Sequence, residues 1–164
     1  MELDKINGNT FWKDTKRREL GQINNYDALR DMGKGWNAPS GYKKIRVHLV
    51  YDVKVTLDQK ARLVADGHLT ETPLDGVYSS VISLRGLKMA LMIAELNQLE
   101  AWCTDIGNAY LEAYTEELLY IITGPEFEEL EGHCMIIVKA LYGTKMGGVQ
   151  WWERFLNEIG RAHV

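Results

Sequence analysis

Glu100–Glu112 reads EAWCTDIGNAYLE and is the stretch on which the expected fold depends. An apolar run, Ala101–Cys103, leads to Asp105, and the turn-like Gly107–Asn108 separates this run from a second apolar patch at Ala109–Leu111. The pattern predicts a strand that ends in one carboxylate at the rim of a sheet, where a fold can present a metal ligand. A carboxylate in such a place can also be a strand-end cap or an ordinary surface acid, and the residues alone leave these alternatives open.

The composition is typical of one globular domain. The chain has 164 residues, 46% of them apolar and 26% charged, and this length is sufficient to bury a core. It contains no run of about 18 apolar residues, so no membrane span is predicted. The two cysteines imply no disulfide framework and favour a reduced intracellular setting, either cytoplasmic or nuclear.

The charge is distributed unevenly along the chain. Residues 1–70 carry 13 Lys or Arg against 9 Asp or Glu, whereas residues 71–164 carry 6 against 14. The basic half suits contact with phosphate and the acidic half suits a metal, although ordinary solvated surface charge explains the same asymmetry. The net charge of −4 argues against a stand-alone nucleic-acid-binding protein.

Two alternating runs predict an antiparallel hairpin. Ile45–Val55 places every second apolar residue on one face, and Lys60–Asp66 does the same after a turn at Thr56–Gln59. Lys60 and Arg62 then project together from the outer face of the second strand. They are candidate ligands of an anion, and the alternative is a pair of solvated charges.

The remaining periodicity predicts further helices, strands and loops. The apolar face of a long helix after Ser83 is expected to be buried, with Met89 and Met92 filling the core. The predicted elements are a helix at Phe11–Ile23 capped by Thr10, a short helix at Tyr26–Met32, a loop at Gly33–Gly41, an irregular segment at Thr70–Ser80, a helix at Leu84–Leu99 capped by Ser83, strands at Glu116–Thr123 and Cys134–Ala140, and a helix at Val149–Ile159.

Three blocks, in this order along the chain, resemble one family. They read KARLVADG at Lys60–Gly67, DIGNAYL at Asp105–Leu111 and LYGTKM at Leu141–Met146. In these blocks the chain resembles the reverse transcriptases of copia-type (Ty1/copia) retrotransposons, whose patterns run Lys-Ala-Arg-Leu-Val-Ala-Lys-Gly, Asp-Val-x-x-Ala-Phe/Tyr-Leu and Leu-Tyr-Gly-Leu-Lys-Gln. This chain departs from those patterns at Asp66, Thr144 and Met146.

The resemblance implies a fold and a division of the chain. The expected class is α+β, an antiparallel sheet with helices packed on one face, as in part of the fingers and palm of a reverse transcriptase. Residues 1–42 would form an N-terminal helical arm and loop, and residues 43–164 the partial fingers and palm domain.

The resemblance also implies roles for individual residues. The family's reaction is template-directed addition of deoxynucleotides with Mg²⁺, and its partners are an RNA or DNA template–primer, a deoxynucleoside triphosphate and the remainder of a polyprotein. Asp105 would be the catalytic residue and a metal ligand, with the backbone carbonyl of Ile106 as another. The residues implied to bind substrate are Lys60 and Arg62 at the triphosphate, Tyr110 as the steric gate against a ribose hydroxyl, and Lys145 in the Leu-Tyr-Gly block. From the residues alone, Tyr110 could equally be a buried ring with its hydroxyl satisfied.

One part of the family's active site is missing from the sequence. The family carries a second carboxylate pair in a Tyr-x-Asp-Asp hairpin, and no two aspartates are adjacent in this chain. Two-metal catalysis needs several carboxylates, so the chain alone is predicted to be inactive. The alternative is a non-catalytic relic that keeps the fold as a nucleic-acid-binding or interaction domain. A single-strand RNA-binding module fits less well because of the acidic balance.

Overall fold

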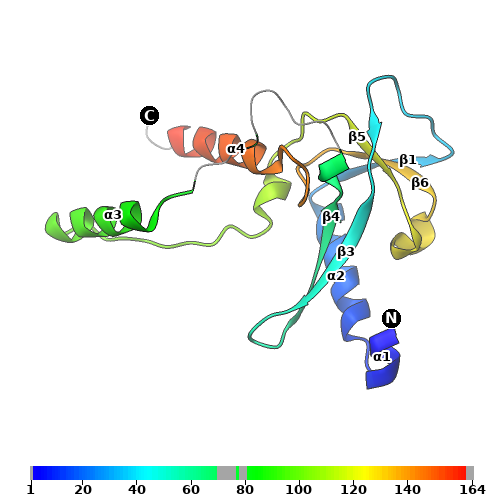
Figure 1. Cartoon of the computed structure of the whole chain (residues 1–164), viewed down its shortest axis with the longest axis horizontal. Helices are drawn as coiled ribbons and strands as arrows, with labels where there is room; N and C mark the ends of the chain where they lie inside the picture. Colours follow the sequence, from blue (N-terminus) through cyan, green and yellow to red (C-terminus); the bar gives the residue numbers. More distant parts are fainter. Residues whose placement is uncertain (1, 70–76, 78–80, 162–164) are drawn as a thin grey trace.

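The computed structural model describes residues 2–69, 77 and 81–161 of the chain (Figure 1). The predicted irregular segment at Thr70–Ser80 lies outside the described residues, apart from residue 77. In chain order the described elements are α1 (Glu2–Asn7), α2 (Phe11–Asn25), β1 (Leu29–Lys34), β2 (Lys43–Lys44), β3 (Val47–Val53), β4 (Gln59–Ala65), η1 (Gly67–Leu69), α3 (Leu84–Leu96), η2 (Ala109–Glu112), β5 (Leu119–Ile122), η3 (Pro125–Leu130), β6 (His133–Ile137) and α4 (Gly147–Arg161), where η denotes a 3-10 helix.

The described strands form two sheets. The larger has the order β1-β6-β5-β2, in which β6 pairs antiparallel with β1 and β5, and β2 runs parallel to β5. β3 and β4 form a separate antiparallel hairpin. The predicted α+β class with mainly antiparallel strands is therefore confirmed. The strands nevertheless lie in two sheets instead of one, and a parallel pair is present.

The predicted hairpin is confirmed in detail. Leu49 of β3 lies opposite Leu63 of β4, and the inward face of β4 is buried at Ala61, Leu63 and Ala65. The alternation extends further in the sequence than burial does in the structure, because Val55 at the turn is fully exposed. The tip of the hairpin projects beyond the body of the protein (Figure 1).

The hydrophobic core lies where α2, the β3–β4 hairpin and the larger sheet meet. Leu63, Ile121 and Leu141 have no exposed surface, and burying one such side chain contributes about 1.5–3 kcal/mol. The buried residues of this core are Ile23, Ala28, Ile45, Leu63, Ala65, Leu111, Leu119, Ile121, Met135, Ile137 and Leu141.

The helix predicted at Phe11–Ile23 is confirmed, but its cap differs from the prediction. Thr10 occupies the N-cap position, yet its hydroxyl donates to Asp14 Oδ2 at 2.7 Å instead of capping the backbone. Asp4 of α1 takes that role, since its carboxylate accepts from the backbone N–H groups of Trp12 at 3.1 Å and Lys13 at 3.0 Å. α1 therefore supplies the first turn of α2 with its missing acceptor.

The short helix predicted at Tyr26–Met32 is wrong. α2 ends at Asn25, Asp27 turns the chain with a φ of 50°, and the segment continues as β1. β1 pairs with β6, where Leu29 lies opposite Ile137. Its partner is more than a hundred residues away in the sequence, so the pairing overrides the local helical preference. β1 also takes up the first residues of the loop predicted at Gly33–Gly41.

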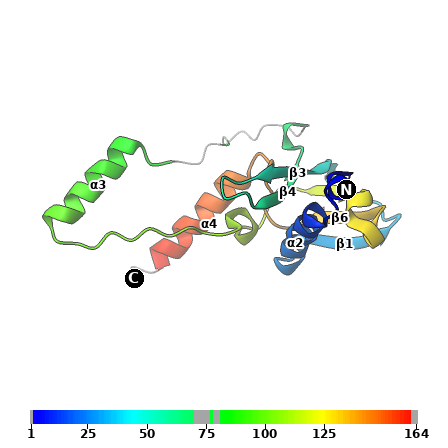
Figure 2. The ribbon, with the colours of Figure 1, turned by 90° about the horizontal axis from the view of Figure 1, so that it is seen from below.

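The helix predicted after Ser83 is present as α3, and Ser83 Oγ caps it by accepting from Gly86 N–H at 3.1 Å. The prediction that its apolar face is buried is wrong. Figure 2 shows α3 standing away from the sheets, and the helix contains no buried residue. Met89 and Met92, expected in the core, are 54% and 57% exposed.

The strand predicted to end in Asp105 is also absent. Residues 99–106 have no regular secondary structure, and Trp102 in that segment is 90% exposed. The strands predicted at Glu116–Thr123 and Cys134–Ala140 are present as β5 and β6, and the last predicted helix as α4. Among the described helices, none has the length and apolar character that a bilayer crossing requires.

Candidate functional site

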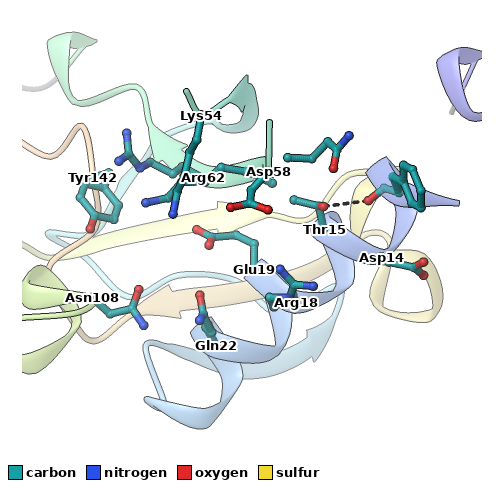
Figure 3. A pocket seen from close by; sticks show the side chains of 14 residues that line it. Asp14, Thr15, Arg18, Glu19, Gln22, Lys54, Asp58, Arg62, Asn108 and Tyr142 are labelled. Carbon is teal, nitrogen blue, oxygen red and sulfur yellow. Dashed lines mark hydrogen bonds between the residues drawn. The ribbon is translucent and has the colours of Figure 1, made fainter. Parts of the chain in front are cut away.

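A cavity of about 600 Å³ lies beside α2 and the hairpin (Figure 3). Lys60 and Arg62 of β4 line it, together with Tyr142 from the Leu-Tyr-Gly block and Asn108 from the turn before η2. Two predicted substrate-binding residues therefore face one space. The charged residues of the lining are Arg18, Lys54, Lys60, Arg62, Asp14, Glu19 and Asp58.

Arg62 lies against one ring of an aromatic pair. Its Cζ lies 5.6 Å from the centroid of the Tyr142 ring, a distance at which a cation is attracted to an aromatic face. The ring of Tyr110 is tilted against Tyr142, with the two centroids 5.0 Å apart. Tyr142 thus joins Arg62 to Tyr110, the residue predicted to be the steric gate.

The local fold explains the position of Tyr110. Asn108 adopts a left-handed conformation with a φ of 54° and opens η2, and its carbonyl accepts from Leu111 N–H at 2.8 Å. Leu111 is buried in the core. Because η2 is anchored through Leu111, the preceding ring of Tyr110 is directed toward Tyr142.

Asp105 lies in the irregular segment before η2 and is exposed. Burial raises the pKa of the Tyr142 hydroxyl, and the positive charge of Arg62 opposes that rise. The charge of Asp105 also raises the pKa of Tyr142. Asp105 is therefore within electrostatic range of the ring that contacts Arg62, although no strand holds it there.

Lys145 is not among the described residues that line the cavity. Burial raises the pKa of the Glu117 carboxyl, whereas the backbone N–H of Met146 and the charge of Lys145 lower that pKa. The structure thus brings Lys60, Arg62 and Tyr110 together, with Asp105 within electrostatic range, and places Lys145 beside Glu117.

Glu19 is a site residue that the sequence analysis did not identify. It is only 9% exposed, lines the cavity and accepts from the backbone N–H of Leu63 at 2.8 Å. Burial raises its pKa, while the bond from Leu63 and the charges of Lys60 and Arg62 lower it. Thr15, Glu19 and Ile23 recur at intervals of four on the buried face of α2, and this spacing was the available signal.

The residues present do not make a two-metal site by themselves. Asp105 and the backbone carbonyl of Ile106 are the predicted oxygen donors, and Asp105 is exposed on an irregular segment. Within residues 2–69, 77 and 81–161, no three His, Cys, Asp or Glu side chains gather where they could hold a metal ion. A pair of Mg²⁺ ions needs more carboxylates than this arrangement provides.

Comparisons with known proteins agree with the sequence motifs. Residues 34–161 match the family described as reverse transcriptase (RNA-dependent DNA polymerase). The Transposon Ty1-BL Gag-Pol polyprotein of Saccharomyces cerevisiae is 33% identical over 57% of this chain and 5% of its own length. The Transposon Ty1-DR4 and TyH3 Gag-Pol polyproteins of Saccharomyces cerevisiae are each 31% identical over 63% of this chain and 6% of their own length. The chain thus spans about one-twentieth of these relatives, and no solved structure matches it.

Proposed function

Because the chain belongs to the reverse transcriptase (RNA-dependent DNA polymerase) family, we propose that it forms the part of a retrotransposon polymerase that receives the incoming deoxynucleotide. One observation carries this proposal: Arg62 lines a cavity and contacts Tyr142, which contacts Tyr110 in turn. A phosphate-binding cation, an aromatic sugar gate and a polar cavity are the elements that selection of a nucleotide requires.

In this proposal each side chain contacts a different part of the nucleotide. Arg62 offers a planar fork of donors to the phosphate oxygens, and Lys60 adds a second positive charge. Tyr110 packs where a ribose 2′-hydroxyl would lie and so favours deoxyribose. Asp105, with the carbonyl of Ile106, would provide the first oxygen ligands for Mg²⁺, and Lys145 would contact substrate from the Leu-Tyr-Gly block.

The 164-residue polypeptide alone does not polymerise in this proposal, because Asp105 lacks the further carboxylates that two metal ions need. Relatives of the chain are Gag-Pol polyproteins, so the other ligands would come from another segment of such a polyprotein. A primer-extension assay on an RNA template with Mg²⁺ tests this. We expect no extension by the polypeptide alone, and clear synthesis would contradict the proposal.

The alternative is a non-catalytic relic that retains nucleic-acid binding, and the lone carboxylate is the observation that favours it. Titration with a primer–template at several salt concentrations tests for binding, because phosphate contacts make affinity fall as salt rises. Arg62→Ala is expected to weaken binding and to reduce the salt dependence. Arg46→Ala is the matched control, since Arg46 is 76% exposed and pairs with Asp66 at 3.6 Å. Equal effects of the two substitutions would argue against a role for the cavity.

A further inference from the structure

We propose that Glu19 is a positioning residue for Lys60 and Arg62, an inference that rests on the proposed nucleotide site. Glu19 belongs to α2, which precedes the segment that matches the family. Its carboxylate reaches across to β4 and accepts from the backbone N–H of Leu63 at 2.8 Å. Leu63 directly follows Arg62, so this bond fixes the strand at the point where the guanidinium leaves it.

The unpaired outer edge of β4 explains why the bond from Leu63 N–H to Glu19 forms. β4 pairs with β3 on one side only, and the edge of a two-stranded sheet leaves backbone donors unpaired. Leu63 N–H is bonded to Glu19, and two residues further along Ala65 N–H donates to the carbonyl of Tyr142 at 2.7 Å. α2 and the Leu-Tyr-Gly block therefore hold successive donors of one edge.

This edge is where the predicted phosphate ligands originate. Arg62 precedes the Glu19-bonded residue by one position and its side chain meets the Tyr142 ring. Without Glu19, the backbone N–H of Leu63 would lose its acceptor, and the outer edge of β4 beside Arg62 would keep the bond at Ala65. Figure 3 shows Glu19 and Arg62 on opposite walls of the cavity, with Tyr142 on the Arg62 side. The buried carboxylate thus sets the backbone position and leaves the guanidinium available to a ligand.

Two variants separate the hydrogen bond from the charge. Glu19→Gln and Glu19→Ala both remove the negative charge, but only glutamine keeps an oxygen for Leu63 N–H. The measurements are amide hydrogen exchange at Leu63 and a titration with sodium tripolyphosphate, followed at the amides of Lys60 and Arg62 by NMR. We expect Glu19→Gln to retain protection at Leu63 and to bind tripolyphosphate about fivefold or more tightly than Glu19→Ala.

Asp14→Ala is the matched control. Asp14 lines the same cavity from the same helix, but it accepts from Thr10 and not from β4. This control removes an acid from the cavity and should leave exchange at Leu63 unchanged.

The outcomes distinguish this inference from the proposed function. Absence of saturable tripolyphosphate binding by the unmodified chain would overturn the phosphate site itself. Binding by the unmodified chain with equal affinity and equal Leu63 exchange in Glu19→Gln and Glu19→Ala would overturn the role of Glu19 alone. Should Glu19→Ala fail to fold, Glu19→Asp keeps the charge but shortens the reach. We expect it to lose Leu63 protection, and undiminished protection would overturn the inference.

Discussion

Some carboxylates in this chain accept hydrogen bonds from backbone N–H groups, in addition to those that belong to the proposed site. Asp4 and Glu19 are 6% and 9% exposed, and each accepts backbone N–H groups from another element. Burying a charge is costly unless it is hydrogen-bonded, and these bonds recover part of that cost. Such acids link elements that the sequence alone does not show to be neighbours.

Replacing Asp4 with alanine should destabilise the protein by about 1–2 kcal/mol, the usual cost of losing a helix cap. The reason is that Trp12 and Lys13 would lose the acceptor for their backbone N–H groups. Urea unfolding followed by circular dichroism measures the change. Thr10→Ala is the control, because the Thr10 hydroxyl donates to the exposed Asp14 side chain and makes no cap hydrogen bond to α2. An equal loss in the two variants would show that Asp4 is not the cap.

Glu19→Gln should stabilise the protein at pH 7, and the gain should shrink as the pH falls toward 4.5. Burial raises the pKa of Glu19 above its ordinary value of 4.5, so the folded state holds this proton at pH values where the unfolded chain has released it. Unfolding therefore becomes easier as pH rises through that window, and glutamine removes the dependence. Thermal unfolding of both proteins from pH 4 to 8 measures it. A constant difference across this range would contradict the assignment.

At the scale of elements, the Leu-Tyr-Gly turn touches β4 where no side chain fits. Gly143 has a φ of 88°, and a Cβ there would lie 2.1 Å from the carbonyl oxygen of Ala65. Gly143→Ala should therefore cost more than the roughly 1–2 kcal/mol of a left-handed alanine and should separate the turn from β4. Gly33→Ala is a matched control, since Gly33 has a φ of 85° with open space around it. Urea unfolding of both variants measures the difference, and equal losses would argue against the close contact.

The sequence predicted the elements whose signal is local. The β3–β4 hairpin follows from strict alternation, and α2 and α4 from helical spacing. β1 and the missing strand before Asp105 could not be predicted, because a strand exists only with its partner: β1 finds β6, and the apolar run around Trp102 finds no partner in the described part of the chain.

The candidate site was predictable to the same extent. Lys60, Arg62 and Tyr110 were identified by resemblance to the family, and the structure brings them together around Tyr142. Their roles remain predictions. Glu19 was missed, because a glutamate on an amphipathic helix usually belongs to the solvated face and only the packing of α2 on β4 reveals its contact with Leu63.

At the scale of the whole molecule, the buried core and the exposed apolar face of α3 lie in different parts of the structure. The core joins α2, the hairpin and the larger sheet, whereas α3 stands apart with its leucines in solvent (Figure 2). Among the described residues, the buried core therefore includes none from α3. The same separation explains why a helix with an apolar face was predicted correctly and its burial was not.

Leucine-to-alanine substitutions measure how much the core and α3 each contribute to the free energy of unfolding. Leu63→Ala should cost about 2–5 kcal/mol, because Leu63 is fully buried and its removal leaves a cavity. Leu91→Ala should change the free energy of unfolding by less than about 0.5 kcal/mol, since Leu91 of α3 is 50% exposed and alanine is a good helix former. Urea unfolding of the 164-residue chain at low protein concentration gives both values. A loss at Leu91 comparable to that at Leu63 would mean that α3 packs on the body in solution and that its apolar face belongs to the core.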